Sequence, residues 1–226
     1  MKKKYAFTGK TREFVYREDG GIPRRIMVRQ IVALEDVVGP DEVVADAGDV
    51  GGWIEHEGNL SREDGAWVSN NAYVFGNAKV FGNAFVGGKA YVYDNAEVGG
   101  YTNIEGHANV CGNAKLLSNS IIQGHVLICG NATIAGDGIC DIDGDVTIGG
   151  DAYLTSSNDF FNIAGIEDDH SVTFFKCNDG SIQAWVKHTK NPVTFDEYVE
   201  SVKQTNPKLC DAMAEFVKIR LGFAEV

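Results

Sequence analysis

The middle of the chain alternates apolar and polar positions with a period of six residues. From Gly65 to Gly136, twelve successive units carry Ala, Ser, Thr or Val at the second position and Val, Ile or Leu at the fourth. The pattern moves by two residues at Asp137-Gly138 and resumes for three more units from Ile139 to Ser156. A short, fixed period that persists over fifteen units is typical of a solenoid, in which each repeat stacks on its neighbours.

The six-residue unit itself predicts a short strand followed by a corner. Side chains alternate along an extended chain, so the second and fourth residues face inward and the third faces outward. Gly and Asn fill many of the remaining positions, and both tolerate the positive φ that a tight corner requires. Three units close a triangle, so the sequence predicts a mainly β protein built on a parallel β-helix of about five coils.

Two short segments extend this prediction to a known superfamily. Val86–Ala90 reads V-G-G-K-A and Ile148–Ala152 reads I-G-G-D-A, and both resemble the hexapeptide repeat of left-handed β-helix transferases. The resemblance implies left-handed coiling, and it implies a homotrimer. It also implies acyl transfer from coenzyme A, although such enzymes usually add a loop that carries a catalytic histidine, and no such loop interrupts the twelve units here.

The chain as a whole resembles a group of phage and prophage β-helix proteins. The matching features are Gly51–Glu55 with the sequence G-G-W-I-E, the following Asn59-Leu60-Ser61, the repeats and a small C-terminal module. This resemblance implies a protein that acts in the host cytoplasm and interferes with a host system.

The regions on either side of the repeats predict a cap and a module. Residues 5–16 and 22–34 read as two strands around Asp19-Gly20-Gly21, and they are expected to cover the open end of the helix. Beyond Ser156, three strands precede a capping box at Thr194–Glu197 and a second helix that starts at Pro207. We therefore divide the chain into an N-terminal β cap (1–64), a left-handed β-helix (65–156) and an α+β module (157–226).

Charge is distributed unevenly along the chain and restricts the possible partners. Residues 1–30 hold nine Lys or Arg against three Asp or Glu, whereas residues 31–156 hold four against eighteen. An acidic surface repels phosphate groups, so the coil is not expected to bind nucleic acid or a membrane. The chain also lacks a run of 18 apolar residues, and its five cysteines read as reduced thiols of a cytoplasmic protein.

Several large apolar residues occupy positions that the repeat turns outward. Stacking at eighteen residues brings them into two stripes, which a soluble monomer would not expose without a partner. We therefore expect a homo-oligomer, dimer or trimer, with these residues in its interface. They are Tyr73, Phe75, Tyr91 and Tyr93 on one face, and Trp67 and Phe85 on another.

Two histidines fall on the same corner of adjacent coils. His107 and His125 are eighteen residues apart, below Lys89 in the same column. Stacked histidines resemble the zinc sites of γ-class carbonic anhydrases, but a catalytic zinc needs three protein ligands. We expect corner residues without catalytic function, no metal and no cofactor. If the protein is an enzyme, these two histidines are the candidate bases.

These observations favour a non-catalytic binding protein of the phage type. It would inhibit or sequester a host factor, either a host protein or a small ligand, through the faces of the β-helix and the C-terminal module. Two alternatives stay open: an acyltransferase that uses coenzyme A, and an acidic mimic of DNA. Salt-sensitive binding to a DNA-binding protein would favour the mimic, whereas stabilisation by coenzyme A would favour the enzyme.

Overall fold

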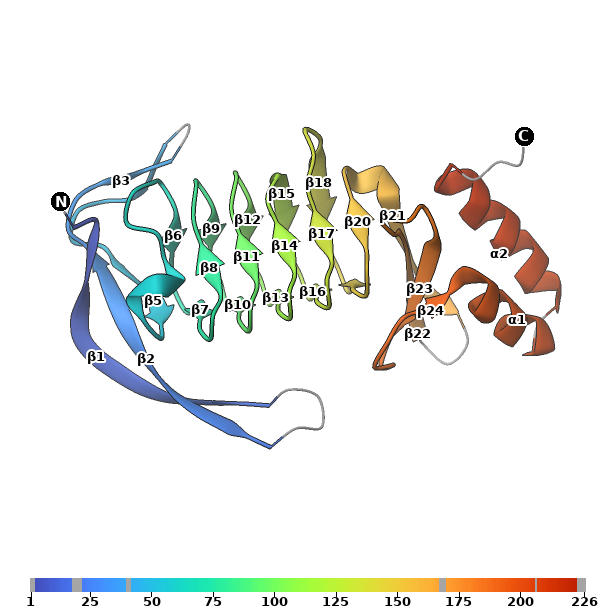
Figure 1. The fold of residues 1–226 in the computed structure, drawn as a ribbon, viewed down its shortest axis with the longest axis horizontal. Helices are drawn as coiled ribbons and strands as arrows, with labels where there is room; N and C mark the ends of the chain where they lie inside the picture. The colour runs from blue at the N-terminus through green and yellow to red at the C-terminus, as the bar shows by residue number, and fades with distance from the viewer. Residues whose placement is uncertain (1–2, 18–21, 40–41, 167–169, 206, 223–226) are drawn as a thin grey trace.

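The chain folds into a parallel β-solenoid with a β-hairpin at one end and a small sheet with two helices at the other (Figure 1). This computed structural model describes residues 3–17, 22–39, 42–166, 170–205 and 207–222. The prediction of a mainly β fold with a parallel β-helix is confirmed. Left-handed coiling stays a prediction.

Three parallel sheets form the faces of the solenoid. The first face consists of β5 (Val50–Ile54), β7 (Tyr73–Val74), β10 (Tyr91–Val92), β13 (Asn109–Val110), β16 (Leu127–Ile128) and β19 (Thr147–Ile148). The second consists of β8 (Lys79–Val80), β11 (Glu97–Val98), β14 (Lys115–Leu116), β17 (Thr133–Ile134) and β20 (Tyr153–Leu154). The third consists of β6 (Trp67–Val68), β9 (Phe85–Val86), β12 (Asn103–Ile104), β15 (Asn119–Ile122) and β18 (Ile139–Ile142).

The register between coils follows the sequence period. Tyr73 pairs with Tyr91, eighteen residues later, whereas Leu127 pairs with Thr147, twenty residues later. The two additional residues are Asp137-Gly138, and they accompany the longer strands β15 and β18 on the third face. The shift in the pattern therefore predicts the register of the last coil correctly.

The interior and the corners also follow the six-residue unit. Val80 and Val98 are fully buried, while Lys79 is exposed on the same strand as Val80. Stacked corners approach one another so closely that some admit only glycine: Gly88 has a φ of 62°, and a Cβ added there would lie 2.8 Å from the backbone nitrogen of Gly106. Small residues at these positions let the coils stack at the spacing of a β-ladder.

The N-terminal segment closes one end of the solenoid and extends along its side. Strands β1 (Tyr5–Tyr16) and β2 (Arg24–Ala33) pair antiparallel, and β2 also pairs with β5, the first strand of the first face. The short strands β3 (Val37–Val38) and β4 (Val43–Ala45) and the turn η1 (Glu57–Asn59) complete this end. The predicted turn at Asp19-Gly20-Gly21 lies outside the described residues.

The C-terminal module packs an antiparallel sheet against two helices. After the turn η2 (Ser157–Asp159), its strands are β21 (Phe160–Ile166), β22 (His170–Lys176), β23 (Ile182–Val186) and β24 (Val193–Thr194), and its helices are α1 (Phe195–Thr205) and α2 (Pro207–Arg220). The predicted capping box is present, because the Glu197 nitrogen donates to Thr194 Oγ1 and the Thr194 nitrogen donates to Glu197 Oε2.

The apolar residues of the last helix differ in burial. Met213 and Val217 are buried, whereas Phe216 is 53% exposed. Its ring lies at the edge of the packed surface, where it meets the Phe161 ring edge-on at 5.6 Å.

Candidate functional site

The two histidines lie together on the corner that leads into the first face. The rings of His107 and His125 are stacked, with centroids 4.9 Å apart and planes 8° from parallel. Both side chains are exposed, as is that of Lys89 one coil earlier. Asp145, one coil later in the column, forms an ion pair with Lys187 of the C-terminal module. We call these four corner residues, Lys89, His107, His125 and Asp145, the histidine column.

The histidine column has side chains suited to proton transfer. An imidazole gains and loses a proton near neutral pH, so an exposed pair provides a group that can accept a proton from a substrate. Among the described residues, no group of three or more His, Cys, Asp or Glu side chains could hold a metal ion. The histidine column also includes Lys89, whose ammonium group can pair with an anionic substrate.

The first aromatic stripe is covered by the N-terminal hairpin of the same chain. Phe14 stacks on Tyr73 with ring centroids 4.8 Å apart, and Tyr16 packs on Phe75 at 4.7 Å. Tyr73 is 6% exposed and Phe75 is 1% exposed, so the expectation that they form an open surface is wrong. The cause is the alternation along β1, which turns Phe14 and Tyr16 toward the first face while Val15 points to solvent.

Polar contacts also hold β1 of the hairpin against the first face. Arg12 donates a hydrogen bond to the Tyr73 hydroxyl, and its guanidinium lies 4.4 Å from the centre of the Trp53 ring. A cation above an aromatic face is attracted by the negative charge density of the ring. The basic hairpin is therefore attached to the aromatic face by charge as well as by apolar contact.

The remaining residues of the two stripes differ in exposure. Tyr91 and Tyr93 are half-buried at the far end of the hairpin contact, and Phe85 is half-buried on the third face. Trp67 is 1% exposed because its ring lies against Gly51 of β5, where an added Cβ would be 2.7 Å from the indole. The expectation that Trp67 lies on an open surface is therefore wrong. An interface between protomers at Tyr91, Tyr93 and Phe85 stays a prediction.

Below the stripe, a column of polar groups continues along the first face. Tyr93 lies one coil before Cys111, and burial raises the pKa of Tyr93, with further contributions from the Cys111 thiol and from a hydrogen bond to it. Cys111 and Cys129 are half-buried, and none of the five cysteines forms a disulfide. The alignment of these two thiols on adjacent coils confirms the eighteen-residue stacking.

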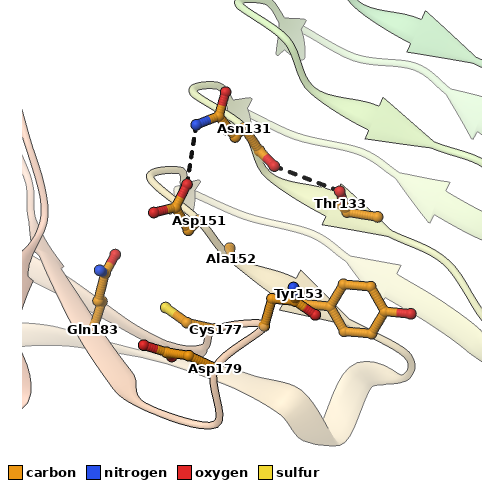
Figure 2. Close-up of a pocket in the computed structure, with 9 residues that line it drawn as sticks. Asn131, Thr133, Asp151, Ala152, Tyr153, Cys177, Asp179 and Gln183 are labelled. Carbon is orange, nitrogen blue, oxygen red and sulfur yellow. Dashed lines mark hydrogen bonds between the residues drawn. The ribbon is translucent and has the colours of Figure 1, made fainter.

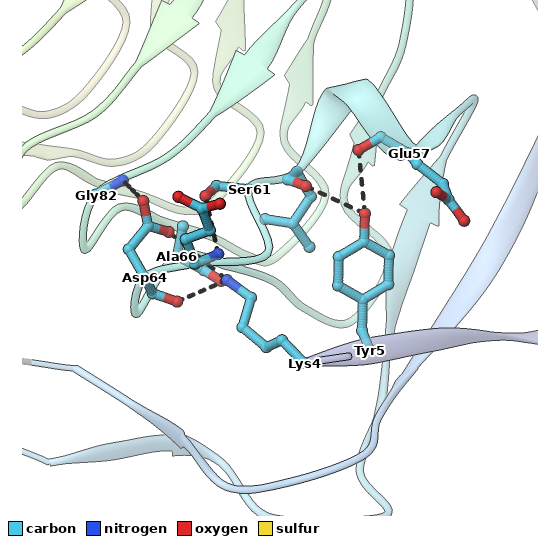
Figure 3. Close-up of polar contacts among 9 residues, drawn as sticks. Lys4, Tyr5, Glu57, Ser61, Asp64, Ala66 and Gly82 are labelled. Carbon is cyan, nitrogen blue, oxygen red and sulfur yellow. Dashed lines mark hydrogen bonds and ion pairs between the residues drawn. The ribbon is translucent and has the colours of Figure 1, made fainter. Parts of the chain in front are cut away.

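A buried lysine joins the N-terminus to the first coil (Figure 3). Lys4 is 5% exposed and donates to the carbonyl oxygens of Asp64 and Ala66, at 2.7 and 2.8 Å. Its ammonium lies 3.7 Å from Asp64 Oδ1. Burial lowers the pKa of Lys4 to about 8, against the opposing effect of the Asp64 carboxylate. These contacts fix the cap to the solenoid, and the sequence pattern did not reveal them.

An open site lies at the other end of the solenoid. A cavity of about 420 Å³ lies between the last coil and the C-terminal module, beside the point where they touch (Figure 2). One wall includes Asn131 and Asp151 from a corner of the solenoid, and the other includes Cys177, Asp179 and Gln183 from β23 and the turn before it. We call this space the terminal cavity.

Backbone contacts fix the two walls of the terminal cavity relative to each other. Ala152 and Cys177 form an isolated antiparallel bridge, and the Asn178 nitrogen donates to the Asp151 carbonyl at 3.3 Å. The terminal cavity is therefore part of a defined contact between the solenoid and the module.

Sequence analysis missed the terminal cavity, although one signal for it is present in the repeat. The corner column that begins at Asn77 carries asparagine in four coils and then Asp151 in the last. This change from amide to carboxylate is visible in the sequence once the two-residue shift is taken into account. The opposite wall has no such signal, because it belongs to a separate element.

Comparison with known proteins gives one partial similarity. No protein-family model matches the chain. A stretch of 66 residues, 29% of the chain, is 36% identical to the uncharacterized acetyltransferase YdcK of Escherichia coli (strain K12). The match covers 18% of that protein, so the chain spans a small part of this relative's length.

This similarity agrees with the fold. A parallel β-solenoid with a six-residue repeat is consistent with the hexapeptide-repeat superfamily, and the matched protein is described as an acetyltransferase. The resemblance to phage and prophage proteins receives no support from the comparison. In the parts of the chain that the structure describes, no helix has the length and apolar character needed to cross a membrane.

Proposed function

We propose that this protein is a hexapeptide-repeat acyltransferase that takes its acyl group from a thioester of coenzyme A. The observation that carries the proposal is the stacked pair His107 and His125, exposed on one corner of a solenoid that is locally similar to an acetyltransferase. This reading replaces the non-catalytic phage inhibitor as the first choice, because the partial match favours acyl transfer.

The chemistry requires one histidine to act as a general base. Its neutral imidazole nitrogen accepts the proton from an acceptor hydroxyl or amine as the acceptor atom attacks the thioester carbonyl carbon. A new C–O or C–N bond forms, the C–S bond breaks, and the sulfur leaves as a thiolate that takes up a proton. The second ring, stacked at 4.9 Å, holds the first in position.

The histidine column provides one wall of such a site. It is a convex and exposed corner, so a second wall must come from a neighbouring copy of the chain. Lys89, one coil away, is the cation of the column that could contact an anionic group of the donor. The proposal therefore includes a homo-oligomer, with the substrates bound between adjacent solenoids.

The test is release of free thiol from acetyl-coenzyme A in the presence of a panel of amines and alcohols. We expect turnover by the unmodified protein and a loss of about a hundredfold or more in the double variant His107→Ala/His125→Ala, which removes the general base whichever ring provides it. Asn71→Ala is the matched control, because Asn71 is an exposed residue at the same corner, two coils before His107 and outside the histidine column. Lys89→Ala should weaken stabilisation by coenzyme A in a thermal shift.

A second candidate, a non-catalytic binding protein, is favoured by the charge of the solenoid. Residues 31–156 carry eighteen acidic and four basic side chains, which is unfavourable for the phosphates of coenzyme A. Absence of both turnover and a coenzyme A shift would contradict the enzyme and support this candidate. Binding to a basic protein that weakens steeply with salt would then identify the acidic surface as the recognition element.

A further inference from the structure

Two cysteine thiols occupy the same place in the repeat on neighbouring coils of the solenoid. Cys111 follows β13 and Cys129 follows β16, two strands that pair in register and lie side by side in Figure 1. The ladder continues through both residues, because each cysteine nitrogen donates to a carbonyl of the next coil, at 2.9 and 3.0 Å. The residue before each cysteine, Val110 or Ile128, is fully buried, so the two thiols lie on the outer side of the first face, one coil apart.

The spacing of the coils suits a disulfide between these two thiols. Neighbouring strands lie about 4.7–4.9 Å apart, and the Cα atoms of a disulfide are usually about 4.4–6.8 Å apart. The Cα–Cβ bonds of stacked residues are nearly parallel, so their Cβ atoms are also separated by about 4.8 Å, slightly more than the roughly 3.5–4.5 Å of most disulfides. A bridge therefore needs only a small movement of the two coils, and the strain that remains makes it easy to reduce.

The two thiols lie close to each other between two aromatic side chains. Burial raises the pKa of Tyr93, one coil before Cys111, and the Cys111 and Cys129 thiols raise it further. On the other side, a Cβ added at Gly149 would lie 2.9 Å from Cys129 Sγ and would also contact the Trp185 ring. Both thiols are half-buried, so a small molecule can reach them.

The other three cysteines are not stacked on a second thiol. Cys140 lies on β18 of the third face, and Cys177 and Cys210 belong to the C-terminal module. All three are buried, and burial raises the pKa of Cys140 to about 12 and that of Cys177 to about 11, which keeps these two thiols protonated and unreactive. Cys111 and Cys129 are therefore the cysteines placed to react with each other.

We propose that Cys111 and Cys129 form a redox-sensitive pair, which a hydroperoxide converts to a reversible disulfide between adjacent coils. In the first step, one thiol and hydrogen peroxide give a sulfenic acid and water. In the second step, the other thiol attacks the sulfenic sulfur, the S–S bond forms, the S–O bond breaks, and the hydroxyl leaves with the thiol proton as water. The two thiols lose two electrons and two protons, and the peroxide takes them up. A dithiol reductant reverses the bond by exchange.

The bridge would fasten the middle of the first face. It adds a covalent bond between the coil beside Tyr93 and the coil beside Trp185. Closing the loop from Cys111 to Cys129 stabilises the folded chain by restricting the unfolded one, and the strain in the bridge limits this gain. The solenoid would then be more stable under oxidising than under reducing conditions. The proposal goes beyond acyl transfer and does not depend on it.

The experiment treats the full, reduced chain with a small excess of hydrogen peroxide and maps its disulfides by peptide mass spectrometry without reduction. We expect one bridge, between Cys111 and Cys129, with the loss of two hydrogen atoms, and we expect dithiothreitol to restore both thiols. The oxidised chain should unfold about 5 °C higher than the reduced chain. Mapping the unmodified chain identifies the bridge directly, so this result does not depend on whether a variant folds.

Serine variants identify the two sulfurs that react. Cys111→Ser and Cys129→Ser should each abolish the bridge and the rise in unfolding temperature. Cys140→Ser is the matched control, because Ser120 occupies the position in register on the previous coil and shows that a buried hydroxyl fits in this column. It should form the bridge as the unmodified chain does.

The variant His107→Ala/His125→Ala should also form the bridge, which separates this proposal from the proposed enzyme. Oxidation of either thiol to a sulfinic acid without a bridge would overturn the proposal. So would a bridge that involves another cysteine or a second chain, or a rise in unfolding temperature that persists in Cys129→Ser.

Discussion

Single residues of the solenoid differ sharply in what they can tolerate, because each strand turns one side chain inward and the next outward. Val98 is fully buried among the aliphatic side chains of the interior, whereas Lys79 on a neighbouring coil of the same face is exposed. Apolar side chains of the core surround Val98, and they can neither solvate a carboxylate nor pair with it. The position in the repeat therefore determines the effect of a substitution.

We expect Val98→Asp to lower the free energy of unfolding by at least about 3 kcal/mol, because it places an unpaired charge in an apolar interior. Lys79→Ala should change it by less than about 0.5 kcal/mol, as is usual for an exposed side chain. Urea unfolding followed by circular dichroism measures both. Equal sensitivity of the two variants would show that the inward and outward positions are assigned incorrectly.

The lowered pKa of Lys4 predicts that the stability of the folded chain depends on pH. Burial lowers its pKa from 10.5 to about 8 in the folded chain, so between these values the unfolded chain binds more protons. The free energy of unfolding contributed by Lys4 therefore rises as the pH increases from about 8 to about 10.5. Lys4→Met should remove this rise, measured as the difference from the unmodified protein at each pH.

Lys79→Met is the control for Lys4, because it removes the same charge from an exposed side chain. It should leave the pH dependence of unfolding unchanged. The assignment to Lys4 fails if the two variants give the same profile across this range.

The N-terminal hairpin is the element whose packing departs most from the sequence prediction. Its strands and pairing are predicted, since residues 5–16 and 22–34 correspond closely to β1 and β2. Its position over Tyr73 and Phe75 is not, because a repeat shows which side chains face outward but not what lies against them. The apolar alternation of Phe14 and Tyr16 does show that one face of the hairpin needs a partner.

The same distinction between local and long-range information applies to the candidate site. The stacking of His107 on His125 follows from the eighteen-residue period alone, and the structure confirms it. The terminal cavity depends on how the turn at Cys177–Gly180 docks on the last coil, through the bridge between Ala152 and Cys177. The six-residue repeat of the solenoid does not extend into the C-terminal module, so no local sequence pattern shows how the two pack against each other.

A double substitution in the hairpin tests its attachment to the first face. In Phe14→Asp/Tyr16→Asp, two charges would oppose the aromatic rings of Tyr73 and Phe75, so we expect the hairpin to detach and stability to fall by about 2–4 kcal/mol. Binding of a hydrophobic dye and faster hydrogen exchange in β2 would report the exposed surface. The signal from the solenoid strands should persist.

Val15→Asp is the matched control for the hairpin, since Val15 lies between the two aromatic residues and is 49% exposed. It should leave both dye binding and hydrogen exchange near those of the unmodified protein. Similar behaviour of the single and double variants would contradict a specific contact between the hairpin and the first face.

Basic and acidic side chains are concentrated in different parts of the molecule, and this affects which partners can bind to each part. A basic hairpin lies over one face of an acidic solenoid, and Arg12 is directed to the aromatic groups beneath it. The two open features, the histidine column and the terminal cavity, belong to different corners of the solenoid.

The oligomeric state decides whether the histidine column can be an active site. Two exposed imidazoles on a convex corner do not exclude water, so acyl transfer requires a second copy beside them. We therefore expect an assembly, a trimer by the superfamily resemblance, with a mass by light scattering of about three times the 24.5 kDa of the chain.

Tyr91→Glu/Tyr93→Glu should give a folded monomer that has lost turnover, because these half-buried side chains continue the first face beside Lys89. The Phe14→Asp/Tyr16→Asp variant frees the hairpin without changing either tyrosine and so separates loss of the interface from loss of the hairpin contact. A mass of 24.5 kDa for the unmodified protein would contradict both the assembly and the active site that depends on it.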